Sequence, residues 1–112
     1  MTSIANPNLN SDIQIPRPYS TEMRAVLRII ETDNYLRDNV LPFIDLEHES
    51  IEWDQIFSFA FGSGHRAALV FAFGLWADQL RDGPDPFDAA FSLNPTLQRA
   101  VFQGLAIRWG LF

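Results

Sequence analysis

An apolar run from Ala67 to Ala77 limits what this chain can fold into more than any other feature of its sequence. Its eleven residues extend about 16 Å as an α-helix, whereas a helix needs about twenty residues to cross a bilayer core. We therefore expect no membrane span. A helix that is apolar on nearly all sides needs neighbours on several sides, so the run predicts a central core helix from about 64 to 81.

The motif Phe-Ala-Phe-Gly occurs twice, at 59–62 and at 71–74. The residues that flank the two copies do not match. The first copy is predicted to end a helix and the second to lie inside one, so Gly62 interrupts a helix and Gly74 permits close packing. We interpret the repetition as coincidence in a chain with ten Phe, not as a duplicated unit.

Helical spacing also predicts helices before the apolar run. Ser20 or Thr21 begins a helix whose apolar stripe has the spacing i, i+3, i+4, i+7: Met23, Val26, Leu27 and Ile30. Asp33 is placed to cap a new turn, so the segment up to Pro42 is either one kinked helix or two short ones. Ser50 is then the predicted N-cap of a helix that continues to Phe61.

Capping residues mark the helices that follow. Ser63 is the predicted N-cap of the core helix, which Gly83 and Pro84 end. Two later helices begin where a capping residue precedes a proline, a pairing that suits the first helical position. These pairs are Asp85-Pro86 and Asn94-Pro95.

These patterns together predict an all-α fold. We expect one domain over residues 20–112, a compact bundle of five or six helices around the central apolar helix. The period-two alternation of strands is weak everywhere except in residues 13–19. Residues 1–19 are rich in Asn, Ser and Pro and have few apolar anchors, so we expect a flexible N-terminal arm.

The charged residues are unbalanced, and they exclude several functions. Fourteen acidic residues oppose eight arginines, with no Lys, which gives a net charge of −6. Such a chain is repelled by phosphate, so we expect no direct binding of nucleic acid. The absence of Cys excludes disulfides, thiolate nucleophiles and Cys-ligated metals. The N-terminus lacks the pattern of a signal peptide, so we expect a cytoplasmic protein.

The stretch 45–54 is the most acidic part of the chain. Its carboxylates surround His48, but no second ligand pair has metal-binding spacing, so we expect no metal site. We expect this stretch to bind a basic surface of a partner protein, with a tryptophan as the interface anchor. The chain is then an adaptor or an inhibitor, for example one from a phage or mobile element that covers a nucleic-acid-binding surface. The predicted partner-binding residues are Asp45, Glu47, Glu49, Glu52, Trp53 and Asp54.

Residues 62–66 offer an alternative function as a binding site for an anion or small molecule. The N–H groups at a helix start, with a hydroxyl and a guanidinium nearby, are suited to an anion. The spacing is not that of a P-loop. The simpler interpretation is a turn in which His65 and Arg66 are solvated, with an acidic partner near Arg66. The residues of this alternative site are Ser63, Gly64, His65 and Arg66.

The C-terminus ends in large apolar side chains, which are unusual to leave in water. Trp109, Leu111 and Phe112 either fold back onto the core or lie in the interface of a homodimer. No catalytic motif accompanies them. Ser63 is too close to His65 in the chain to form a Ser–His pair, and no nucleophile elbow occurs. We expect neither an enzyme nor a cofactor.

Overall fold

Side-chain caps begin the first two helices of this computed structural model, which describes residues 19–79 and 85–111. The Ser20 hydroxyl accepts the N–H of Met23 at 3.1 Å and precedes α1 (Thr21–Glu31). The Asp33 carboxylate accepts the N–H of Leu36 at 2.9 Å and precedes α2 (Asn34–Val40). Because the second cap satisfies the free N–H groups of a new helix start, the segment is two short helices. A 3₁₀ turn, η2 (Leu41–Phe43), follows.

The two helices predicted to begin at prolines are confirmed. α5 (Pro86–Phe91) follows Asp85, whose carboxylate accepts the N–H of Phe87 at 2.7 Å. α6 (Pro95–Arg108) follows Asn94, whose side chain accepts the N–H of Leu97 at 2.8 Å. Both starts combine a side-chain acceptor with a proline, which lacks the N–H that a first helical position would leave unpaired.

Residues 44–51 hold a β-hairpin where the sequence predicts a charged connection and a helix cap. β1 (Ile44–Asp45) pairs antiparallel with β2 (Ser50–Ile51). The prediction that Ser50 caps a helix is therefore wrong. α3 (Trp53–Ser58) begins later, and it ends before Phe61. Strands of two residues are too short to show a period-two pattern in the sequence.

α4 (Ser63–Ala77) is the predicted core helix, with both ends shifted. Its N-cap is Gly62, so Ser63 is the first helical residue and the prediction that it is the cap is wrong. The helix ends at Asp78, which has a left-handed φ of 59°. The Arg108 side chain caps the C-terminal end of α4. Its Nε donates to the carbonyl of Leu75 at 3.0 Å, and its Nη2 donates to the carboxylate of Asp78 at 2.7 Å. Residues 80–84, with the predicted stop, lie outside the described residues.

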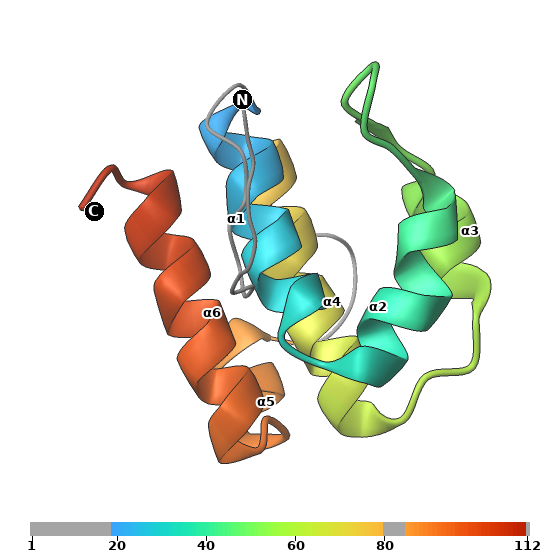
Figure 1. Cartoon of the computed structure of the whole chain (residues 1–112). Helices are drawn as coiled ribbons and strands as arrows, with labels where there is room; N and C mark the ends of the chain where they lie inside the picture. Colours follow the sequence, from blue (N-terminus) through green and yellow to red (C-terminus); the bar gives the residue numbers. More distant parts are fainter. Residues whose placement is uncertain (1–18, 80–84, 112) are drawn as a thin grey trace.

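The chain folds into a compact and mostly helical body, as the sequence predicts. α1 packs against α2, α4 and α6, and α4 packs against α1, α5 and α6. α6 lies on one side of the α1–α4 pair, and α2 and α3 lie on the other (Figure 1). Within the described ranges, no helix is long and apolar enough to cross a membrane. The predicted arm lies outside the described residues, except for Tyr19.

α1 and α4 share the centre of the core. All four residues of the predicted α1 stripe are buried. α4 is not buried on all sides, because Phe71, Phe73 and Trp76 keep part of their surface exposed. The largest fully buried side chains come mainly from α1, α2, α4 and α6: Met23, Ile29, Ile30, Leu36, Ile56, Leu69, Leu97, Val26 and Val40.

The close approach between helices occurs at a glycine other than the predicted one. Among the described residues, a Cβ on Gly74 would meet only the carbonyl of Gln79, 3.9 Å away, so Gly74 is not a packing glycine there and that prediction is wrong. A Cβ on Gly104 of α6 would lie 3.1 Å from a methyl of Leu75 and 3.2 Å from the carbonyl oxygen of Ala25. Gly104 therefore lets α6 pack closely on α1 and α4.

Candidate functional site

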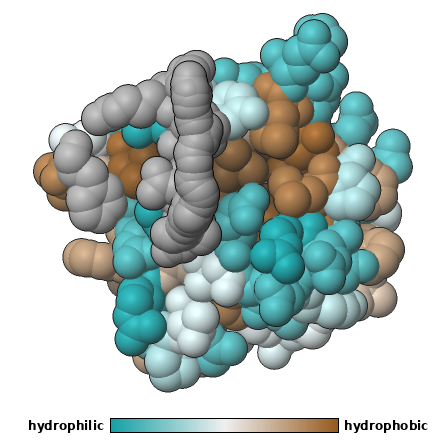
Figure 2. Space-filling model, viewed as in Figure 1, coloured by the Kyte–Doolittle hydropathy of each residue, from teal (hydrophilic) through white to brown (hydrophobic). Residues whose placement is uncertain are grey.

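The predicted partner-binding stretch forms a hairpin followed by the start of α3. We call residues 44–54 the acidic hairpin. It carries five carboxylates and no arginine, and the whole segment between Arg37 and Arg66 lacks a basic residue other than histidine. The hairpin projects from the end of the molecule where α1 begins (Figure 1). Figure 2 shows hydrophobic side chains at the surface between α1 and the hairpin, with hydrophilic side chains at the hairpin tip.

Asp45 holds the turn of the hairpin together. Its Oδ1 accepts the N–H groups of Glu47 and His48, each at 3.1 Å, and its Oδ2 lies 2.8 Å from Nδ1 of His48. The hydrogen bond from the His48 side chain, followed by those from the backbone, lowers the pKa of Asp45 from its usual value. Asp45 therefore stays ionised at neutral pH and keeps its negative charge in the hairpin.

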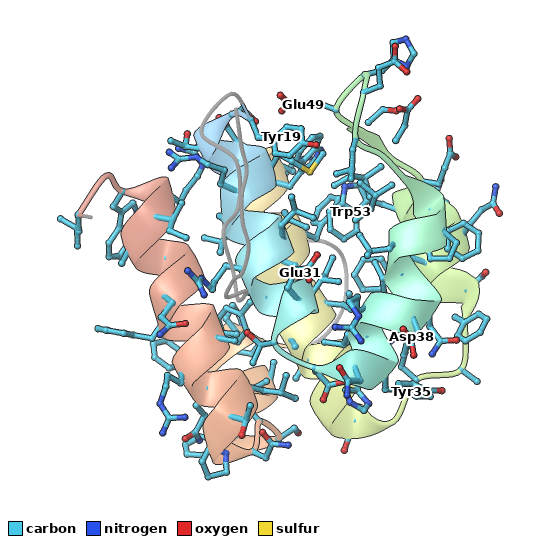
Figure 3. The ribbon with its side chains drawn as sticks, in the orientation of Figure 1. Tyr19, Glu31, Tyr35, Asp38, Glu49 and Trp53 are labelled. Carbon is cyan, nitrogen blue, oxygen red and sulfur yellow. The ribbon has the colours of Figure 1, made fainter. Side chains whose placement is uncertain are left out.

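Glu49 joins the hairpin to the start of α1. Its Oε1 accepts the hydroxyl of Ser20 at 2.6 Å, and both carboxylate oxygens lie 3.3 Å from the Ser20 backbone nitrogen. Figure 3 shows Glu49 beside that helix start, near Tyr19. The backbone of Glu49 is left-handed, with a φ of 50°. A carboxylate at a helix N-terminus is favourable for the helix dipole, so Glu49 stabilises the fold and is not available to a partner.

Trp53 belongs to the core and not to the surface. Its side chain is 8% exposed and makes an edge-on contact with Phe73, with ring centroids 5.2 Å apart. A second ring, Phe57, lies 6.0 Å away. In the view of Figure 3, Trp53 lies in the interior between α1 and α2. A partner cannot reach a ring in this position without opening the core, so the prediction of Trp53 as an interface anchor is corrected.

The remaining acidic side chains, Glu47, Glu52 and Asp54, are exposed. Glu52 and Asp45 line a hollow of about 370 Å³ on the hairpin. The polar side of the hollow is completed by Ser50 and Gln55, and its apolar side is formed by η2 and β1 at Pro42, Phe43 and Ile44. Two acidic residues therefore line one concave surface that also has an apolar wall.

The residues of the alternative site at 62–66 contact separate neighbours and do not surround one common binding position. His65 is only partly solvated, because its Nε2 lies 3.1 Å from Oδ2 of Asp33 and its ring stacks on Tyr35 with centroids 4.9 Å apart. Burial raises the pKa of Asp33, but hydrogen bonds from the Leu36 N–H and from His65 outweigh it, and the pKa is lowered overall. A carboxylate thus occupies the position beside His65 that an anion would need.

Gly64 and Arg66 also have other roles. A Cβ on Gly64 would lie 3.0 Å from the carbonyl oxygen of Ser92, so this glycine admits the loop between α5 and α6. The guanidinium of Arg66 lies 5.5 Å from the centre of the Phe57 ring and donates to the Phe57 carbonyl at 3.3 Å. Ser63 and Arg66 do line a cleft of about 240 Å³, but Asp88 of α5 lines it too.

Trp109 and Leu111 do not fold back onto the core. Trp109 and Leu111 are 68% and 69% exposed, and Phe112 lies outside the described residues. Phe102 of α6 is 72% exposed, and Phe87 and Phe91 of α5 are 80% and 86% exposed. From the sequence we singled out Trp109 but not the exposed rings of Phe87, Phe91 and Phe102. The signals were the i, i+4 spacing of the α5 pair and the i, i+7 spacing of Phe102 and Trp109.

No protein family, curated protein or solved structure matches this chain. In the part of the chain that the structure describes, no group of three or more His, Cys, Asp or Glu side chains is arranged to hold a metal ion.

Proposed function

We propose that this chain is a protein-interaction module, an adaptor or an inhibitor, whose acidic hairpin binds a basic segment of a partner protein. The hollow lined by Asp45 and Glu52 is the observation that carries the proposal. An arginine side chain has an apolar stem and a planar cationic head. The wall formed by Pro42 and Phe43 suits the stem, and the exposed carboxylate of Glu52 suits the guanidinium.

The charge distribution supports the same function. The carboxylates of Glu47 and Glu52 hold no hydrogen bond or ion pair with another described residue, so they are available to a cationic group. No arginine of the hairpin neutralises them. A cluster of one sign attracts a basic partner over roughly a Debye length, about 8 Å at physiological ionic strength. Basic surfaces that bind nucleic acid have the complementary charge, whereas DNA and RNA themselves are repelled.

The structure changes which residues an experiment should test. Reversal of Glu49 would also remove the contact with Ser20, and reversal of Asp45 would open the turn. The informative variant is therefore Glu47→Arg with Glu52→Arg. The matched control is Glu31→Arg with Asp88→Arg, which changes the net charge equally but lies on α1 and α5, outside the hairpin.

A synthetic arginine-rich peptide of about fifteen residues, followed by fluorescence anisotropy at several salt concentrations, serves as the probe. We expect the hairpin variant to bind at least tenfold more weakly than the parent, and the control variant to bind within about twofold of it. Binding should weaken as salt rises. An equal loss in both variants would mean that only net charge attracts the peptide, and the proposed function would then be rejected.

A further inference from the structure

The outer face of α6 carries large exposed apolar side chains and no acidic residue. Phe102 and Trp109 lie seven residues apart, which places them on one face of the helix, and both are about 70% exposed. Leu111, beyond the end of the helix, is similarly exposed. From Ala89 to the C-terminus the chain contains no Asp or Glu, although it carries fourteen in all. The lack of acidic residues therefore distinguishes the charge of this face from that of the rest of the chain.

We propose that this face of α6 binds a second copy of the chain and forms a twofold symmetric dimer. Two copies with a net charge of −6 repel each other through most of their surfaces. The α6 face is an exception, because α6 itself carries no carboxylate. The single described charge on its outer side is Arg99, since Arg108 pairs with Asp78 at 2.7 Å and with Glu22 at 3.3 Å.

The position of Phe102 fits antiparallel pairing of α6 with α6 of the second copy. α6 runs from Pro95 to Arg108, so Phe102 lies near its midpoint. About a twofold axis at that midpoint, the Phe102 rings of the two copies meet. Trp109 lies seven residues after Phe102 and Pro95 seven before it, so Trp109 of one copy reaches the exposed Pro95 of the other. An indole ring and a proline ring make a favourable apolar contact.

The exposed apolar side chains supply part of the area that a dimer interface needs. A large aromatic side chain buries about 150–250 Å² when covered. Phe102, Trp109 and Leu111 at about 70% exposure then contribute roughly 450 Å² per copy, about half of the 800 Å² per partner in a standard interface. Pro95, Gln98 and Arg99, which are exposed on the same helix, provide further contact area. The architecture places the two acidic hairpins away from the dimer interface, because α6 and α2–α3 lie on opposite sides of α1 and α4 (Figure 1).

Sedimentation equilibrium tests the proposal. At about 100 µM the parent should have twice the 12.8 kDa mass of one chain, and Phe102→Asp should have the mass of one chain. Phe87→Asp is the control, because it removes an equally exposed ring from α5. Association should strengthen with salt, which screens the repulsion between copies. A monomeric parent, or an equal loss of mass in Phe87→Asp, overturns the assignment to α6.

A cysteine placed at the axis tests the antiparallel arrangement. The chain contains no Cys, so Phe102→Cys and Phe87→Cys each carry one thiol. Under mild oxidation at the concentration used for sedimentation, Phe102→Cys should form a covalent dimer and Phe87→Cys should not. Equal cross-linking of the two variants overturns the proposed pairing. The Phe102→Asp variant should still bind the arginine-rich peptide, so loss of the dimer and loss of peptide binding are distinguishable results.

Discussion

Two glycines in helix interiors should respond in opposite directions to the same substitution. Replacement of a helical glycine by alanine stabilises a helix by about 1 kcal/mol, because the backbone of the unfolded chain loses freedom. The sign in a folded protein then depends on what the new Cβ meets. Gly74 of α4 and Gly104 of α6 are in helices of similar length, so they form a matched pair.

The surroundings of the two glycines set the expected magnitudes. At Gly74 the new methyl has room, so Gly74→Ala should raise the free energy of unfolding by about 0.5–1 kcal/mol. At Gly104 the methyl would lie 3.1 Å from Leu75, 3.2 Å from Ile29 and 3.2 Å from the carbonyl oxygen of Ala25. The side-chain methyls can shift, but the carbonyl belongs to α1 and moves only with that helix. Overpacking of this kind costs about 1–3 kcal/mol, so Gly104→Ala should be destabilised by about 1 kcal/mol net.

Urea denaturation followed by circular dichroism measures both variants. A difference of about 2 kcal/mol between them corresponds to roughly 1 M in the denaturation midpoint. Ile29→Val removes one of the crowding methyls, so the double variant with Gly104→Ala should be less destabilised than the sum of the single changes. A stabilised Gly104→Ala variant, or additive effects in the double variant, would refute the argument that α6 requires a glycine here.

Three further predictions test the contacts around the candidate sites. Glu49→Gln weakens the charge-assisted hydrogen bonds to Ser20, so it should lower the free energy of unfolding by about 1 kcal/mol in thermal unfolding. Glu47→Gln, at an exposed position, should change the free energy of unfolding by less than about 0.5 kcal/mol. The pKa of Asp33 is lowered in the folded state, so its ionised form contributes stability that is present above the unfolded value and is lost as the pH falls through the folded pKa. Below about pH 4 the parent should therefore lose stability more steeply than Asp33→Asn, which keeps an N-cap, and identical slopes in acid denaturation would contradict this. Phosphate up to about 10 mM should not raise the melting temperature. The His65 side chain already contacts the Asp33 carboxylate, and the acidic Asp88 lines the cleft that contains Arg66. A rise that disappears in Arg66→Ala would instead favour the anion-binding alternative.

The hairpin shows where prediction from sequence stops. Ser50 has the residue type of a helix cap and precedes an apolar periodicity, and yet it lies in β2. The pairing of Ile44 with Ile51 and the contact between Glu49 and Ser20 decide the local structure instead. Glu49 and Ser20 are 29 residues apart in the chain, so no local pattern indicates their contact. The acidic character of the hairpin was evident from the sequence, but which of its carboxylates hold the fold together was not.

The exposed aromatic rings show the same limit. Phe57 and Phe102 are equally apolar, but one is 9% exposed and the other 72% exposed. Helical periodicity places Phe102 and Trp109 on one face of α6, and it does not tell whether that face meets another helix. α6 packs on α1 and α4 through Gly104 and its neighbours, so the face with Phe102 is left outside.

By itself, the sequence determined the helical class, the starts of α1, α2, α5 and α6, and the excess of negative charge on residues 44–54. These features depend on interactions between residues a few positions apart, such as N-caps, prolines at helix starts and i, i+3, i+4 spacing. The tertiary structure alone decided that Trp53 is buried and that Gly104, not Gly74, is the packing glycine. It also decided that Glu49 bonds to Ser20 and that His65 contacts Asp33. The physical reason is that burial and long-range contacts depend on which helix faces meet, and that is set by packing of the whole chain.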